Sequence, residues 1–109
     1  MVAEICDIEI VSFNVRGLSD FSKRKDVFEF LRSHSADVIC LEEVHVAPGK
    51  ENSFRNQWGG RAWFSANNST SGGVGILIQN KFACKFIGVG DNGMGSAILL
   101  DIAAIVCYP

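Results

Sequence analysis

The hydrophobic pattern in the first third of this chain restricts the possible folds more than any other sequence feature. Side chains alternate between two faces over residues 8–14, which predicts a β-strand. Residues 21–34 follow with an apolar stripe at helical spacing, and the short apolar run Val38–Glu42 predicts a second strand. A strand, a helix and a strand in so short a stretch form a βαβ unit, so the two strands should be parallel.

The predicted helix has a clear apolar side. Its stripe consists of Val27, Phe28 and Leu31, with Phe30 as an additional candidate. Either Ser19 or Asp20 can cap the helix start. The charged residues that fall largely outside the stripe are Lys23, Arg24, Lys25, Glu29 and Arg32.

The rest of the chain predicts short elements of several kinds. Residues 44–51 form a loop, residues 52–58 form one or two helical turns, and residues 67–73 form a polar turn. Extended segments are expected at residues 61–66, 74–79, 82–89 and 96–108. We therefore expect an α/β fold in which one mixed sheet carries one or two helices on its outer face.

Composition excludes several classes of protein. Hydrophobic residues make up 48% of the 109 positions and the formal net charge is −2, which argues against a disordered chain and against a broad basic surface for nucleic acid. The start is acidic, unlike a secretory signal, and the longest apolar stretch is shorter than the ~20 residues of a membrane helix. We expect an intracellular protein without a membrane partner. Its four scattered cysteines should be small buried residues, not a metal site or disulfides.

Two adjacent acids, Glu42 and Glu43, end the second predicted strand. The carboxyl ends of strands are where α/β sheets bind ligands, and a carboxylate there suits a hard cation. Successive strand residues point to opposite faces, so the two acids should not both reach one metal. Glu43 lies on the face of Ile39 and Leu41. The alternative interpretation is a pair of solvated acids where the chain leaves the sheet.

Asn14 and Arg16 follow the first predicted strand. If the two strands are parallel neighbours, their carboxyl ends lie side by side and Asn14 lies near Glu43. Asn14 can hydrogen-bond a phosphate oxygen or a metal-bound water, and Arg16 can contact a phosphate. The alternative is an Asx turn that leads into the helix.

Residues 88–93 match the pattern GxGxxG, which in dinucleotide-binding proteins lies between a strand and a helix. Here the residues that follow predict a strand. We therefore interpret this segment as a hairpin turn.

Four segments resemble, in order, motifs of the endonuclease/exonuclease/phosphatase superfamily. Arg-Gly-Leu after Asn14-Val15 resembles the LINE-type, abasic-endonuclease-like retrotransposon members in particular. The resemblance implies the N-terminal half of a four-layer α/β sandwich, with residues 1–109 as an incomplete domain. The segments are residues 10–18, 37–45, 72–78 and 106–109.

The same resemblance implies metal-dependent hydrolysis of DNA phosphodiester bonds, usually with Mg²⁺ and with Mn²⁺ as the alternative. Glu43 would be the catalytic metal ligand, and Asn14 would help hold the metal water or the scissile phosphate. Arg16 would contact the substrate, and Tyr108 would approach the phosphate. His45 follows the acid as in the family and would have a supporting or structural role, not that of general base.

The sequence also departs from the family pattern. Glu42 stands in place of the usual Gln, Val44 in place of the usual Thr, and residues 99–106 lack the turn of the usual hairpin. The family's Gly-Asp-Phe-Asn and Ser-Asp-His segments do not occur, so we expect residues 1–109 alone to be catalytically inactive. One alternative is a non-catalytic remnant that binds a partner, or a second copy of itself, through an uncovered sheet face. Another is a fragment of an inositol or lipid phosphatase or of an abasic-site repair nuclease.

Overall fold

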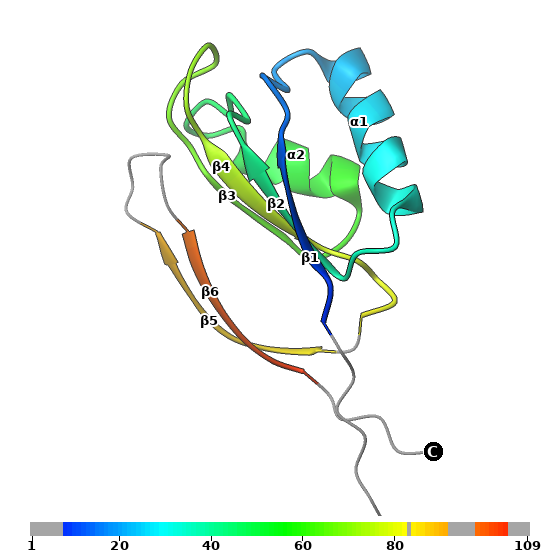
Figure 1. The fold of residues 1–109 in the computed structure, drawn as a ribbon. Coiled ribbons are helices and arrows are strands. Elements are labelled where there is room, and N and C mark those ends of the chain that lie inside the picture. Colours follow the sequence, from blue (N-terminus) through cyan, green and yellow to red (C-terminus); the bar gives the residue numbers. More distant parts are fainter. Residues whose placement is uncertain (1–7, 83, 92–97, 105–109) are drawn as a thin grey trace, which may run out of the picture.

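The computed structural model describes residues 8–82, 84–91 and 98–104 (Figure 1). Its first elements are β1 (Ile10–Asn14), α1 (Phe21–Ser33) and β2 (Val38–Glu42). β1 and β2 are parallel neighbours, with Asn14 opposite Glu42. The predicted βαβ unit is confirmed, although β1 begins later and α1 ends earlier than the pattern suggested.

The start and the buried side of α1 correct part of the prediction. Of the two candidate caps, Asp20 is used: its carboxylate accepts a backbone N–H of the first turn at 2.8 Å. Phe28 and Leu31 are buried, whereas Phe30 is 59% exposed. Arg24 is buried, so placing it outside the stripe was wrong. It precedes Phe28 by four residues, a spacing that puts both on one helix face.

Two more strands complete a mixed sheet in the order β1-β2-β4-β3. β4 (Val74–Ile78) runs antiparallel to both β2 and β3 (Ala62–Ser65). α2 (Glu51–Trp58) connects β2 to β3 and begins one residue before the predicted start. It ends at Gly59, whose φ of 77° is a left-handed conformation that favours glycine.

Both helices cover the same face of this sheet, which we call the outer face (Figure 1). α2 contributes two aromatic residues, of which Trp58 meets Phe28 of α1 edge-to-face at 5.7 Å and Phe54 meets Phe64 of β3 at 5.6 Å. The outer face therefore has a closed apolar core. Its most completely buried side chains from α1 and the sheet are Phe28, Leu31, Ile39, Leu41 and Leu77.

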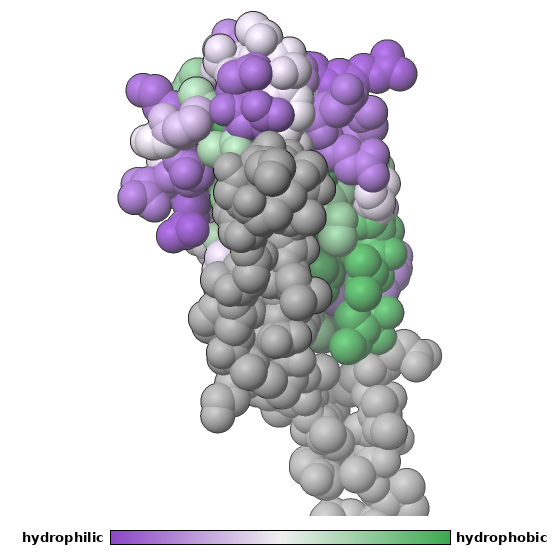
Figure 2. Space-filling model, turned by 90° about the vertical axis from the view of Figure 1, so that its left-hand side faces the viewer, coloured by the Kyte–Doolittle hydropathy of each residue, from purple (hydrophilic) through white to green (hydrophobic). Residues whose placement is uncertain are grey.

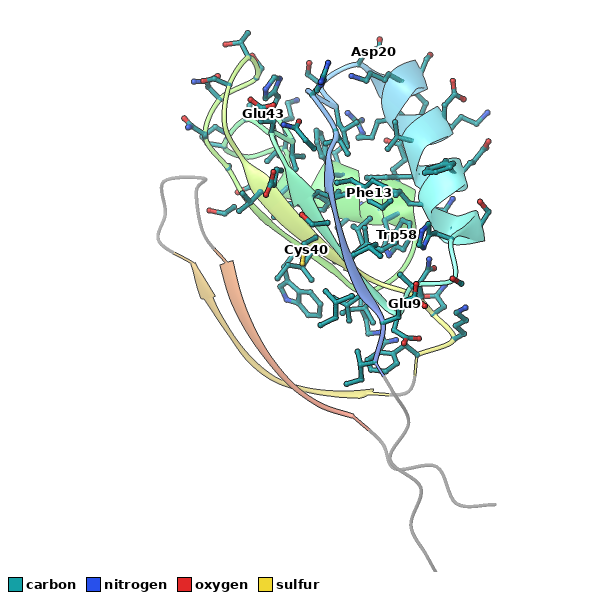
Figure 3. All side chains as sticks on the ribbon, viewed as in Figure 1. Glu9, Phe13, Asp20, Cys40, Glu43 and Trp58 are labelled. Atoms are coloured by element: carbon teal, nitrogen blue, oxygen red, sulfur yellow. The ribbon has the colours of Figure 1, made fainter. Side chains whose placement is uncertain are left out.

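The opposite, inner face is only partly covered by described side chains. Val38, Ile78 and Phe82 form a small buried cluster, while Ile10 of β1 is 62% exposed. Cys40 is half-buried on this face, on the side of β5 and β6 (Figure 3). Burial raises the pKa of its thiol, and Glu42 raises it further. Self-association through this face stays a prediction.

β5 (Cys84–Asp91) and β6 (Ile98–Ala104) form a separate antiparallel pair on the inner side (Figure 1). β6 lies next to β3 and β4, so this pair adds a layer to the predicted mixed sheet. Gly88 and Gly90 lie within β5, so the predicted turn over residues 88–93 was wrong for its first four residues. The next element is a strand and not a helix, and residues 92 and 93 lie outside the described residues. β6 continues without a turn, in line with the turn missing from the sequence.

Polarity changes along the strands. In Figure 2, apolar side chains gather at the lower right, beside the atoms drawn in grey, and hydrophilic ones gather in the upper half and on the left. The upper half is where β1 and β2 end (Figure 1). In the part of the chain that the structure describes, no helix has the length and apolar character needed to cross a bilayer.

Candidate functional site

The loops that follow β1 and β2 continue the pairing of these strands. Backbone N–H groups of Val15, Gly17 and Leu18 donate to the carbonyls of residues 42, 43 and 44 at 3.1, 2.7 and 2.8 Å. We call this region, residues 14–18, 43–46 and 72–73, the carboxyl edge. It brings the ends of both predicted motifs together, as the βαβ unit requires.

Three non-glycine residues of the carboxyl edge adopt a left-handed backbone. Arg16, Glu43 and His45 have φ values of 51°, 52° and 60°, and among the described residues no other non-glycine has a positive φ. Such conformations cost about 1–3 kcal/mol each and tend to cluster at functional sites. The surrounding backbone must therefore hold them in place.

The turn between β3 and β4 supplies part of that support. The N–H groups of Val44 and His45 donate to the carbonyls of Gly73 and Gly72 at 3.0 and 2.9 Å. Gly73 itself has a φ of 83°, and a Cβ there would lie only 3.2 Å from the backbone nitrogen of His45. A glycine at position 73 thus permits the close approach of the two loops.

Asn14 forms the Asx turn that was the alternative interpretation. Its Oδ1 accepts the backbone N–H of Arg16 at 3.1 Å. This bond leaves the side-chain NH₂ of Asn14 as a donor toward solvent, where the residue is exposed. Arg16 is exposed as well. Tyr108, the remaining predicted site residue, lies outside the described residues.

Glu43 lies at the upper end of β2, at the carboxyl edge (Figure 3). The strand alternation used to separate it from Glu42 ends at Glu42, because Glu43 has left-handed backbone. Both carboxylates are exposed. Within the described residues no group of three or more His, Cys, Asp or Glu side chains is arranged to hold a metal ion.

His45 packs against the backbone of Gly17. A Cβ built on Gly17, whose φ is 89°, would lie 2.4 Å from Nδ1 of the imidazole. No side chain larger than hydrogen fits between them without a shift of the ring. This contact joins the two loops of the carboxyl edge and gives His45 a structural role.

Two basic residues of α1 support the edge and were missed in the sequence. Lys23 Nζ donates to the carbonyls of Val15 and Arg16 at 3.2 and 3.0 Å. Arg24 Nη1 donates to the Leu18 carbonyl at 2.8 Å. Burial lowers the pKa of Arg24, an effect that Asp20 opposes. A usable signal was their position in the first turn of α1, directly after the Asn14 loop.

Comparison with known proteins agrees with this geometry. Residues 11–106 match the sequence model of the Endonuclease/Exonuclease/phosphatase family. The chain is 32% identical over 75 residues to the Transposon TX1 uncharacterized 149 kDa protein of Xenopus laevis, and 33% identical over 43 residues to an exodeoxyribonuclease of Bacillus subtilis strain 168. These stretches are 69% and 39% of this chain, but 6% and 17% of the two relatives. Since the family match extends over most of its length, the chain belongs to the endonuclease/exonuclease/phosphatase family.

Proposed function

We propose that this chain contributes the carboxyl edge of a retrotransposon-type endonuclease that hydrolyses DNA phosphodiester bonds with a divalent metal, Mg²⁺ or alternatively Mn²⁺. The observation that carries the proposal is the juxtaposition of the Asn14 and Glu43 loops through continuous backbone hydrogen bonds. The names of the two relatives, a transposon protein and an exodeoxyribonuclease, support DNA as the substrate.

The residues present fit a magnesium ion better than a metal that needs a protein cage. Mg²⁺ is commonly bound by one or two carboxylates, keeps several waters and contacts substrate phosphates. Glu43 would hold it through an exposed carboxylate that the left-handed backbone presents at the strand end. When bound, the ion would lower the pKa of a coordinated water and neutralise charge on the phosphate.

Asn14 and Arg16 would act on the substrate. The amide oxygen of Asn14 is engaged by the backbone of Arg16, so its NH₂ group is the part able to donate to a phosphate oxygen. The exposed guanidinium of Arg16 would add a second, charged donor. By resemblance, Tyr108 would approach the same phosphate. We also propose that residues 1–109 alone do not turn over, because the segments that would activate the water do not occur in this sequence.

Metal binding tests the proposal without requiring turnover. Paramagnetic Mn²⁺ added to the isotope-labelled chain should broaden the amide NMR signals of the carboxyl edge first. Glu43→Gln should remove this selective broadening, while Glu42→Gln, which changes the neighbouring exposed acid, should retain it. Equal broadening in wild type and Glu43→Gln would refute the assignment of Glu43 as the ligand.

A plasmid-nicking assay tests the inactivity of the isolated chain. With Mg²⁺, residues 1–109 should leave supercoiled DNA intact. Nicking that depends on metal and disappears in Glu43→Ala would show that these residues suffice for catalysis, and the proposal of inactivity would then be wrong.

A further inference from the structure

A hollow of about 260 Å³ lies beside the carboxyl edge, between the start of α1, the start of α2 and the loop after β2. Its lining comes from three separate stretches of the chain: residues 19–24, residues 45–54 and Ser69 of the turn between β3 and β4. Its polar lining consists of Ser19, Arg24, His45, Lys50, Ser53 and Ser69.

Most polar side chains of this lining have no protein partner in the described part of the molecule. Neither the ammonium of Lys50 nor the hydroxyl of Ser53 takes part in a hydrogen bond with a described residue. Both belong to the start of α2, where no side chain caps the helix. The first backbone N–H groups of a helix are positive partial charges that stabilise anions.

Arg24 supplies a buried charge to the same hollow. Only 5% of the residue is exposed. Its Nε donates to Gln57 at 2.5 Å and its Nη1 to Leu18, whereas Nη2 donates to no described residue. The guanidinium lies 4.0 Å from the ring centroid of Phe54, another lining residue, which keeps its orientation constant.

Among the described residues, no carboxylate lines the hollow to balance these charges. Asp20 interacts electrostatically with Arg24, but its side chain caps α1 and is not part of the lining. Glu51, in the first turn of α2, lines a different depression. The hollow is therefore lined by two cations, an imidazole and three hydroxyls, and hydrogen-bond donors outnumber acceptors among them.

We propose that this hollow binds a phosphate group. A tetrahedral phosphate has several acceptor oxygens that face different directions, and it can use ammonium, guanidinium and hydroxyl donors from three segments at once. The local arrangement permits this although the whole chain has a net charge of −2. The ligand is recognised by a built cluster and not by a broad basic surface.

The position of the hollow identifies the source of the phosphate as a nucleic-acid backbone. His45 lines the hollow, contacts Gly17 of the carboxyl edge and lies two residues after Glu43. A phosphate in the hollow would thus neighbour the one proposed to react at Glu43. This step rests on the proposed function, whereas phosphate binding itself does not.

The first experiment titrates inorganic phosphate into the full chain, with EDTA present, and follows backbone amides by NMR. The amide signals of residues 50, 53 and 69 should shift together as phosphate is added. Lys50→Gln should weaken binding roughly fivefold, the effect of losing one exposed charged hydrogen bond. Lys25→Gln, an exposed lysine of α1 outside the hollow, is the matched control. Arg24 is avoided because its loss could unfold the chain. Absent binding, or equal weakening by both variants, would overturn the proposal.

The second experiment replaces phosphate by a short DNA duplex, again in EDTA, and measures affinity at several salt concentrations. For Lys50→Gln the slope of log affinity against log salt should fall by about one, as expected for one lost phosphate contact. An unchanged slope together with weakened binding of inorganic phosphate would overturn the nucleic-acid assignment and indicate a small phosphorylated ligand. Because no metal is present, failure of the proposed cleavage chemistry cannot produce either result.

Discussion

The outer face of the four-stranded sheet and its carboxyl edge differ in what holds their residues in place. On the outer face, Phe28, Leu41 and Leu77 are at most 1% exposed and adopt regular strand or helix backbone. At the carboxyl edge, Arg16 and Glu43 are exposed, and hydrogen bonds and glycine contacts maintain a conformation that their own backbone disfavours. Apolar packing stabilises the outer face. At the carboxyl edge, neighbouring loops maintain a left-handed backbone conformation that apolar packing does not require.

The largest expected effect on stability comes from comparing side chains on the two faces of β2. Leu41→Ala removes a fully buried side chain next to the carboxyl edge and should lower the free energy of unfolding by about 3–5 kcal/mol. Cys40→Ala, on the same strand but on the half-buried inner face, should cost under about 1 kcal/mol. Urea denaturation monitored by tryptophan fluorescence measures both. Equal losses would mean that the outer face is not the principal core.

A smaller effect tests the contact between the two loops of the edge. Gly17→Ala and Gly49→Ala place a side chain at nearly equal φ values, 89° and 90°. Gly49 has open space around it, so this change should cost about 1 kcal/mol through the backbone alone. Gly17→Ala should cost about 2–3 kcal/mol, because its Cβ would displace His45.

The double variant Gly17→Ala/His45→Ala is the control for that difference. With the imidazole removed, the added methyl group has room, and its cost should fall to that of Gly49→Ala. If the double variant shows the sum of both single losses, His45 is not the group that Gly17 accommodates.

The smallest expected effect on stability comes from replacing two adjacent acids, Glu42 and Glu43, by glycine. Glu42 has the extended backbone of a strand, so Glu42→Gly should destabilise the chain by about 0.5–1 kcal/mol. Glu43 has left-handed backbone, so Glu43→Gly should be neutral or stabilise the chain by up to about 1 kcal/mol. Thermal melts of the two variants give the comparison directly. Destabilisation of the same size at both positions would contradict the left-handed conformation of Glu43.

The same contrast explains which features could be read from the sequence. The βαβ unit, the order of the elements and the burial of Phe28 and Leu31 follow from hydrophobic spacing, which reports packing. The spacing of Arg24 relative to Phe28 also placed it on the buried face of the helix, but its charge suggested a solvated residue. Its partners, the carbonyl of Leu18 and the amide of Gln57, are close only after folding.

The shape of the carboxyl edge was less accessible to prediction. A positive φ can be predicted from the sequence where the residue is glycine, as at Gly17 and Gly73. It could not be predicted at Glu43, because charged residues rarely adopt this conformation. The turn at Asn14 could be anticipated, because Asn before a helix start is typical of Asx turns. The role of Lys23 depends on two backbone carbonyls whose direction is set by the left-handed Arg16. The position of Lys23 in the first turn of α1 was the local signal of this contact, but it did not identify the two carbonyls.

One further consequence concerns the length of α1. Near its start, Arg24 joins it to Leu18, and at its end the carbonyls of Leu31 and His34 accept bonds from the buried side chain of Gln79, at 2.7 and 3.2 Å. A helix attached near both ends cannot slide along its axis, so its number of residues determines where the Asn14 loop lies relative to the far end of β4. One inserted residue would advance the helix by about 1.5 Å and rotate it by about 100°, enough to break one attachment. The two attachments of α1 therefore fix its length in this part of the molecule.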